Sequence, residues 1–327
     1  MESKKAKGKR QKCTLMVSFF TFTLYFLLLP FYFLLFLSGC QNQALYKDNR
    51  IAMGTFLEVI SPDKRAPGIV FVEIQRIENL LSKYNRDSEV YRLNKLGKLK
   101  VSPDTFYVIK KSVEFWRSSD GAFDITVAPL VDLWGFTEKK YNLPKDAEIK
   151  SALALVGSDK IILHEENNVV EFKTPGMRID LGAIAKGYAL DLAVEKLKAA
   201  NINSCLINLG GQIYCLGDRF GLPWRVAIRS PRQKEFAGYL KLKDRAVATS
   251  GDYEQYFSKG NKRYCHILNP KTGYPASGGI VSVTIIASDG LTADALATAI
   301  FVLGKVKGEA ILRQFPGTEA RIISRQH

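Results

Sequence analysis

Several features that define common protein classes are scarce in this chain of 327 residues. Three histidines leave little material for a histidine-rich zinc site, and five cysteines do not make a disulfide framework at this length. The sequence contains no Walker A motif and no Gly-x-Gly-x-x-Gly pattern after a strand, which excludes the common phosphate-binding loops. With 25 glycines and 12 prolines the chain is not collagen-like, and its 46% hydrophobic content excludes a disordered chain.

The formal net charge of +15 is positive, but the basic residues are dispersed. Residues 1–39 hold six of the basic side chains and one of the acidic ones, which leaves 41 basic and 31 acidic side chains in residues 40–327. Along the sequence no cluster of Lys and Arg is interleaved with aromatic residues, so nucleic-acid binding is not predicted. The basic excess is instead expected to serve solubility, or attraction to anionic ligands or lipid head groups.

The first forty residues have the layout of an export signal. A basic run over residues 4–12 precedes an uncharged apolar stretch over residues 14–37, and Leu37-Ser38-Gly39-Cys40 follows. This ending is similar to a bacterial lipobox, which predicts a signal peptide over residues 1–39, a lipidated Cys40 and a tether over residues 40–50. The alternative is an uncleaved anchor, because the apolar stretch is long enough to span a bilayer as a helix. Either interpretation puts the body of the protein outside the cytoplasmic membrane.

Hydrophobic patterning over residues 51–327 predicts a single α+β domain, of two packed halves. Apolar spacing predicts helices over residues 69–83, 103–118, 182–200 and 291–303. Short apolar or alternating runs predict strands over residues 51–60, 160–164, 169–172, 205–209, 224–228, 238–242, 246–249 and 279–287. Because several strands follow one another without a regular alternation with helices, we expect a largely antiparallel sheet with flanking helices.

Two polar residues of the last predicted helix are candidates for a metal site. Asp294 and Thr298 are four residues apart, which places both on one helix face near the positive end of the helix. A carboxylate and a hydroxyl suit a hard cation such as Mg²⁺, completed by substrate phosphates and water. The plainer alternative is a first-turn acid and a core-facing threonine.

Three other segments could bind a ligand. In residues 180–187, Asp180 precedes small residues and Lys186 follows one turn into a predicted helix, a pattern that suits an anionic ligand or a simple turn. The glycines of residues 208–211 would permit close approach of a flat ligand, or form a turn. His266 has the pKa range of a general base, but a lone histidine is also commonly structural.

Nine segments, taken in order, carry a resemblance to a known family. They are residues 52–55, 81–94, 119–126, 129–136, 180–191, 208–211, 248–251, 266–273 and 294–298. Over roughly residues 51–305 the chain resembles the FAD:protein FMN transferase (ApbE) family of bacterial envelope lipoproteins. The resemblance implies an ApbE-like fold and a Mg²⁺-dependent enzyme. Such an enzyme cleaves FAD to AMP and attaches FMN to a threonine of an envelope protein through a phosphoester.

The resemblance also assigns site residues. It implies an FAD site lined by Met53, Ala122, Phe123, Asp124, Asp180, Lys186, His266, Ile267 and Leu268. It implies that the Ala183 carbonyl, Asp294 and Thr298 hold Mg²⁺, and His266 or Asp294 is the expected catalytic base. Asn269 stands where the family usually has Asp before Pro; a turn-capping role is expected to survive, because Asn also caps turns.

The expected partners are FAD, acceptor flavoproteins of respiratory sodium pumps or electron-transport complexes, and the membrane through a lipid anchor. The expected location is the cell envelope, facing the periplasm or the exterior. Two alternatives remain at this point: an FAD pyrophosphatase that releases free FMN and AMP, and a ligand-binding lipoprotein without catalysis.

Overall fold

A computed structural model of the protein describes residues 44–233, 235–260 and 262–325. The fold described below is that of the compact unit over Leu45–His327. The predicted signal peptide and Cys40 lie outside the described residues. Within the described part of the chain, no helix is long and apolar enough to cross a membrane.

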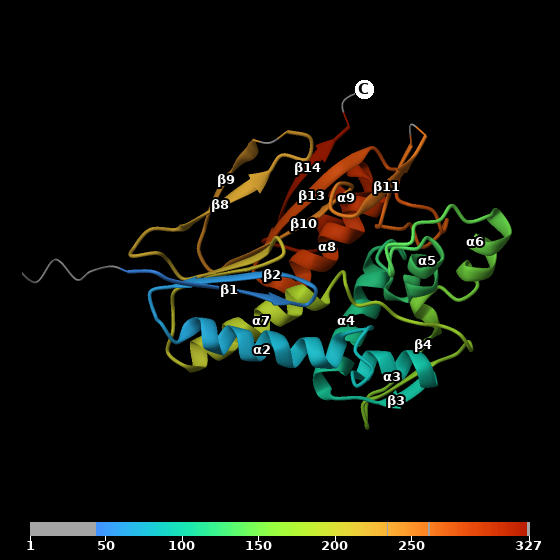
Figure 1. Ribbon diagram of the computed structural model, residues 1–327, viewed down its shortest axis with the longest axis horizontal. Coiled ribbons are helices and arrows are strands. Elements are labelled where there is room, and N and C mark those ends of the chain that lie inside the picture. The colour runs from blue at the N-terminus through green and yellow to red at the C-terminus, as the bar shows by residue number, and fades with distance from the viewer. Residues whose placement is uncertain (1–43, 234, 261, 326–327) are drawn as a thin grey trace, which may run out of the picture. The chain divides into compact units, whose positions relative to one another are not determined.

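A seven-stranded sheet runs through this unit in the order β1-β2-β6-β7-β10-β13-β14 (Figure 1). Its strands are β1 (Tyr46–Ala52), β2 (Thr55–Ser61), β6 (Cys205–Leu209), β7 (Gln212–Leu216), β10 (Arg245–Gly251), β13 (Ile280–Ala287) and β14 (Glu319–Ser324). All neighbouring strands of this sheet are antiparallel. The predicted α+β class with a largely antiparallel sheet is therefore confirmed.

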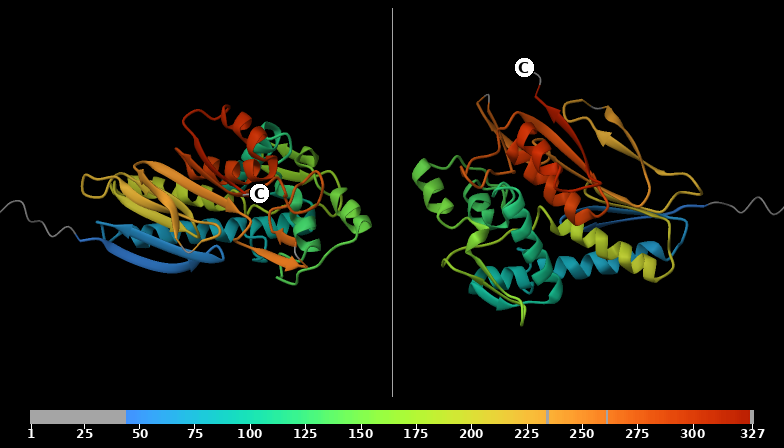
Figure 2. Two further views of the ribbon diagram at one scale, coloured as in Figure 1. Left: turned by 90° about the horizontal axis from the view of Figure 1, so that it is seen from above. Right: turned by 180° about the vertical axis from the view of Figure 1, so that it is seen from behind.

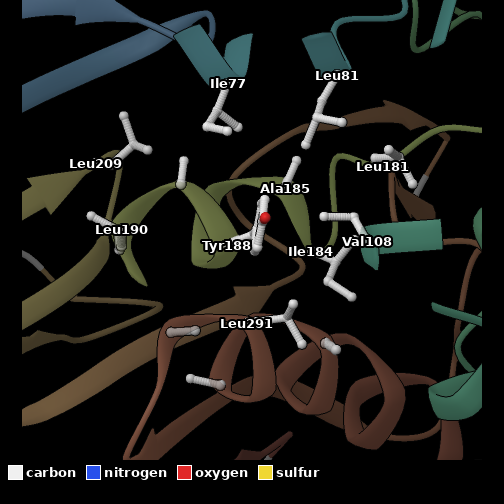
Figure 3. Packing of buried hydrophobic residues seen from close by; sticks show 14 of the residues in the cluster. Ile77, Leu81, Val108, Leu181, Ile184, Ala185, Tyr188, Leu190, Leu209 and Leu291 are labelled. Carbon is white, nitrogen blue, oxygen red and sulfur yellow. The ribbon is translucent and has the colours of Figure 1, made fainter. Parts of the chain in front are cut away.

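Three helices cover one face of the sheet: α2 (Ala66–Leu81), α7 (Ala185–Ala199) and α8 (Gly290–Leu303) (Figures 1 and 2). Helix α8 packs on β10 and β13, while α7 lies between α8 and α2. Figure 3 shows Ile77 of α2, Leu190 of α7 and Leu291 of α8 in one buried cluster. Removal of these apolar side chains from water, at about 25 cal/mol per Å², holds the layers together.

A hairpin of β8 (Trp224–Arg229) and β9 (Phe236–Leu242) covers the opposite face of the sheet. Trp224 packs there with Cys215 of β7 and Ile286 of β13. Because both of its faces are covered, β13 is buried along its whole length. The three described cysteines are free and buried, as expected for apolar thiols. Burial raises the pKa of Cys215 to about 12, so this thiol stays protonated.

The remaining elements form smaller layers around the sheet. They are α3 (Glu89–Leu96), β3 (Lys98–Lys100), α4 (Pro103–Ser118), η1 (Ile125–Val127), α5 (Ala128–Leu133), α6 (Asp146–Leu153), η2 (Ser158–Lys160), β4 (Ile161–His164), β5 (Val169–Phe172), β11 (Tyr256–Lys259), β12 (Lys262–Cys265) and α9 (Lys305–Leu312). Strands β3, β5 and β4 pair in that order, and β11 pairs with β12.

Two predictions at the start of the domain are wrong. Residues 46–50, expected in the tether, belong to β1, and the strand expected over residues 51–60 is two strands joined by a turn. Met53 (φ 49°) and Gly54 (φ 70°) form this turn in the left-handed region, which matches a two-residue hairpin. Residues 46–50 show no strand pattern in the sequence, because β1 is a polar edge strand that is largely exposed to solvent.

Candidate active site

A cavity of about 360 Å³ opens at the end of the sheet where the β1–β2 turn lies. Its wall combines the start of β7, the end of β10, the first turn of α7, the second and third turns of α8, and the segments that follow α4 and β12. All twelve residues that the family resemblance assigned to FAD and Mg²⁺ line it: Met53, Ala122, Phe123, Asp124, Asp180, Ala183, Lys186, His266, Ile267, Leu268, Asp294 and Thr298. The fold thus brings distant sequence segments into one site.

The first turns of α7 and α8 touch backbone to backbone beside this cavity. A Cβ atom added to Gly187 would lie 2.1 Å from the carbonyl oxygen of Gly290, so only glycine permits the crossing. The Asp191 carboxylate of α7 accepts hydrogen bonds from the N–H groups of Gly290 (2.6 Å) and Leu291 (2.9 Å). Asp191 therefore caps α8 from outside that helix. Its position fixes where Asp294, one turn further, enters the cavity.

Asp294 is buried, with 2% of its surface exposed. Its Oδ1 accepts a hydrogen bond from Gln212 Nε2 at 2.8 Å, and its Oδ2 accepts one from the Gly187 N–H at 3.1 Å. Burial raises the pKa of Asp294, and the positive charge of Lys186 opposes this shift. The alternative of a first-turn acid is wrong, because Asp294 lies beyond the first turn of α8 and is buried.

Oxygen atoms gather around Asp294. In a regular helix the Gly187 N–H would donate to the Ala183 carbonyl. Here this N–H donates to Asp294 instead. Among the described residues, no backbone N–H donates to the Ala183 carbonyl. Thr298 Oγ1 lies 3.2 Å from Ser250 Oγ. Gln212 Oε1 is buried without a hydrogen-bond partner in the described part of the chain.

This donor set of carboxylate, hydroxyl and carbonyl oxygens is the kind that Mg²⁺ prefers, so the residues present fit the expected ion. Among the described residues, no group of three or more His, Cys, Asp and Glu side chains could hold a metal ion. The orphaned Gln212 oxygen is the strongest sign of a missing partner, because a buried polar atom without one is costly.

Two lysines line the cavity, and one of them is paired with a carboxylate. Lys83 Nζ lies 2.8 Å from Asp180 Oδ2, and the Gly182 N–H donates to Asp180 Oδ1 at 2.8 Å. Burial acts to raise the pKa of Asp180, but the Lys83 ammonium outweighs it and the pKa is lowered, so this pair is ionised. Lys186 Nζ donates to the Gly182 carbonyl at 2.8 Å and lines the cavity beside Asp180.

The Asp124 carboxylate accepts hydrogen bonds from neighbouring residues of the protein. Its Oδ1 accepts hydrogen bonds from Thr126 Oγ1 (2.6 Å) and Ser158 Oγ (2.7 Å), and the backbone N–H groups of both residues also donate to this carboxylate. Burial raises its pKa, which these hydrogen bonds oppose. The Asp124 carboxylate therefore stabilises the segment that carries Phe123 along the cavity wall. Direct contact between Asp124 and FAD stays a prediction.

His266 has one ring nitrogen fixed by the backbone. Its Nδ1 lies 3.1 Å from the Gln255 carbonyl oxygen; because that oxygen only accepts, Nδ1 carries the proton in the neutral ring and Nε2 is an acceptor. Burial lowers the pKa of His266, and Lys186 contributes in the same direction. Asn269 Oδ1 accepts the N–H of Lys271 at 2.9 Å, which confirms the expected turn-capping role.

Sequence reasoning missed several residues that line the cavity. Gln212 follows the glycine turn at residues 210–211, which packs against Thr55 and does not itself line the cavity. Lys83 and Tyr84 lie in a segment that resembles the family, and Glu254 follows the strand that ends at residue 251. The only sequence signal for Gln212 was the alternation of side chains between the two faces of the sheet along β7, which could have placed Gln212 on the side of the site.

Comparison with known proteins identifies the class. The model of the ApbE family matches residues 53–322, and this chain belongs to the ApbE family. A relative from Klebsiella pneumoniae (strain 342) named FAD:protein FMN transferase is 34% identical over 292 residues, covering 87% of this chain and 91% of the relative. A relative of the same name from Treponema pallidum (strain Nichols) is 37% identical over 274 residues, covering 78% and 75%.

Solved structures agree with this assignment. The crystal structure of the ApbE protein from Thermotoga maritima superposes with a TM-score of 0.80 at 36% sequence identity, covering 86% of this chain and 94% of that one. The flavin transferase ApbE from Vibrio cholerae gives a TM-score of 0.78 at 29% identity, with the same coverage. The predicted family and the ApbE-like fold are confirmed.

Proposed function

We propose that this protein is an Mg²⁺-dependent FAD:protein FMN transferase, which cleaves the pyrophosphate of FAD and joins FMN to a threonine of an acceptor protein. The observation that carries the proposal is the buried Asp294 carboxylate beside the unpartnered Gln212 oxygen, in a cavity that also holds Lys186. The cavity has the size of a small-molecule site. Its apolar wall of Ala122 and Phe123 suits a flavin ring.

In this proposal Asp294, Thr298 and the Ala183 carbonyl hold Mg²⁺. When bound, the ion neutralises charge on the pyrophosphate oxygens and on the departing AMP. Lys186 adds a second positive charge at the cavity wall. The pair of Lys83 and Asp180 fixes the turn before α7, which keeps Lys186 and the Ala183 carbonyl in place.

His266 is proposed as the general base. Its Nε2 takes the proton of the threonine hydroxyl while the threonine oxygen bonds to the phosphorus of the FMN moiety. The bond from that phosphorus to the bridging oxygen breaks at the same time, and AMP leaves with the electron pair. The lowered pKa of His266 keeps the ring neutral and ready to accept a proton at neutral pH.

We further propose that Cys40 is lipidated and that the enzyme works in the cell envelope, facing the periplasm or the exterior. The lipobox-like sequence before Cys40 supports this location. The proposed acceptors are envelope flavoproteins, subunits of respiratory sodium pumps or of electron-transport complexes.

AMP release tests the proposal. Purified protein is incubated with FAD and Mg²⁺, with and without a threonine-bearing envelope protein, and AMP and free FMN are separated by chromatography. A transferase releases AMP faster with the acceptor, whereas equal AMP and free FMN without it indicate a pyrophosphatase. Lys186→Ala should lose cleavage, and Lys95→Ala, which removes an exposed lysine of α3, should keep it. Tight FAD binding without any AMP would contradict both enzymatic functions.

A further inference from the structure

Arginines that are dispersed in the sequence meet on one surface of the fold. This arginine surface consists of Arg225, Arg229, Arg232, Arg263, Arg321 and Arg325. Strand β14, which carries Arg321, lies between the β8–β9 hairpin and the β11–β12 hairpin (Figures 1 and 2). Arg321 Nη1 would lie 3.8 Å from a Cβ atom added to Gly238 of β9. The Arg321 side chain of β14 therefore lies next to the β8–β9 hairpin.

Tyrosine rings hold several of these guanidinium groups in position. Arg225 lies 3.9 Å from the ring centre of Tyr239, and Arg263 lies 4.1 Å from that of Tyr256. These distances are within the range of cation–π contacts, which keep a guanidinium flat against the ring with its N–H groups available. Tyr239 is itself 49% exposed, so the surface offers aromatic area as well as charge.

A single buried carboxylate gathers three arginines at the centre of the surface. Asp252 Oδ2 accepts a hydrogen bond from Arg232 Nη2 at 2.6 Å. Arg263 and Arg325 each have a nitrogen 3.8 Å from an Asp252 oxygen. One negative charge faces three positive ones, so Asp252 positions the group without neutralising it. Such preorganised donors favour binding of carboxylates, because little side-chain freedom is then lost.

The other acidic residues of these segments do little to reduce the positive charge. Glu254 lines the active-site cavity, and Glu319 lies 3.7 Å from Arg245 at the other end of β14. Glu235 is exposed on the loop before β9, while Lys241, Lys259 and Lys262 add further basic groups. The surface therefore carries a clear positive excess.

The arginine surface continues into the rim of the active-site cavity. Asp252 and Tyr253 follow directly after Gly251, at the end of β10, and Glu254 and Gln255 then line the cavity. Arg229 lies 5.6 Å from the Tyr253 ring centre. A molecule bound on this surface would therefore have a part of itself next to the cavity mouth.

We propose that the arginine surface docks an acidic face of the acceptor protein; this inference rests on the proposed function, which requires a polypeptide to bring a threonine hydroxyl into the cavity. Arg and Tyr are the residues that protein interfaces favour, and exposed Phe236 (59%) and Tyr239 supply apolar contact between the charges. Charge complementarity steers the acceptor and sets its orientation. The acceptors are thus proteins with carboxylates flanking the modified threonine.

The test uses two short synthetic peptides with one central threonine each, flanked by Asp in the first peptide and by Asn in the second. Binding to the full-length protein is measured by fluorescence anisotropy. The charge-reversal variant is Arg225→Glu with Arg321→Glu, two exposed residues outside the cavity. The matched control is Arg92→Glu with Arg117→Glu, which makes the same charge change on α3 and α4. FAD binding and thermal melting are measured on every protein.

We expect wild type and the control to bind the Asp peptide more tightly than the Asn peptide. Charge reversal should weaken Asp-peptide binding by roughly tenfold or more and leave FAD binding unchanged. A second measurement uses the wild type alone. Its preference for the Asp peptide over the Asn peptide should shrink as NaCl is added, since the Debye length falls from about 10 Å at 0.1 M to about 3 Å at 1 M.

Equal binding of the two peptides, or full Asp-peptide binding by the reversed variant, would overturn the proposal. The wild type could instead bind phosphatidylglycerol vesicles, lose that binding on charge reversal, and show no preference between the peptides. This result would assign the surface to lipid and would also overturn the proposal. If the Asp peptide binds as expected and FAD is never cleaved, the docking surface stands and the proposed function fails. If FMN transfer proceeds with an unchanged acceptor KM in the reversed variant, the function stands and the docking surface fails.

Discussion

Replacing Asp294 by Asn isolates the carboxylate from its structural bonds. In the wild type, Asp294 accepts hydrogen bonds from the Gly187 N–H and from Gln212 Nε2. An Asn at this position keeps one oxygen for Gly187 and offers Nδ2 to the Gln212 amide after that amide turns over. The turned amide accepts through Oε1, the atom that has no partner in the wild type. We therefore expect a change in the free energy of unfolding below about 1 kcal/mol.

Asp294→Ala should behave differently, because it leaves two buried donors unpaired. Each unpaired donor costs about 1–3 kcal/mol, so the two together cost about 2–6 kcal/mol. Part of this is offset, because burial disfavours the charged carboxylate, as its raised pKa indicates. A net loss of about 2–4 kcal/mol lowers Tm by about 4–16 °C, at about 2–4 °C per kcal/mol for a domain of this size.

Both variants should lose Mg²⁺-dependent FAD cleavage by roughly 100-fold or more, since loss of even an indirect metal contact costs about 10–100-fold. Calorimetry gives Tm, and chromatography of AMP at increasing Mg²⁺ gives the rate. Asn activity within tenfold of wild type at saturating Mg²⁺ would refute the metal-binding role of Asp294. A melting temperature for Asn as low as that for Ala would refute the hydrogen-bond account.

Three further predictions concern other parts of the molecule. His266→Asn should slow transfer by roughly 10²–10⁴-fold with little change in FAD affinity. The wild-type rate should fall with pH only below the ordinary pKa of imidazole, because burial lowers the pKa of His266, and the variant should lack this limb of the pH–rate profile. Burial raises the pKa of Asp191 to about 7, so the folded state holds a proton that the unfolded state releases near pH 4. Wild-type stability relative to Asp191→Asn should therefore fall as pH rises from 4 to 7, and parallel melting curves would contradict this. Metabolic labelling with a tagged fatty acid should mark wild type but not Cys40→Ala; equal labelling would rule out lipidation there.

The elements with strong patterns were predictable from the sequence. The helix expected over residues 103–118 coincides with α4, whose N-cap Ser102 accepts the N–H of Thr105 and whose apolar face is buried. The strand expected over residues 279–287 is β13, a largely apolar strand that is buried along its whole length. Strand β1 was hidden because a polar edge strand has no apolar face, and its pairing depends on the neighbouring β2.

The site was predictable mainly through family resemblance. Residue spacing alone placed Asp294 and Thr298 on one helix face, and both line the cavity. It could not show that Asp294 is buried, because the burial comes from the crossing of α7 at Gly187 and from Gln212 of β7, both distant in sequence. The arginine surface was equally hidden, since its members lie on separate strands and loops that only the fold brings together.

Mass spectrometry of an acceptor tests the central claim most directly. The purified protein is incubated with FAD, Mg²⁺ and a candidate envelope flavoprotein, and the acceptor is then digested and sequenced by fragmentation. The account predicts one threonine that carries FMN through a phosphoester, formed together with an equal amount of AMP and absent when Asp294→Asn replaces the wild type. Acceptors that remain unmodified while FAD is converted to free FMN and AMP would contradict it.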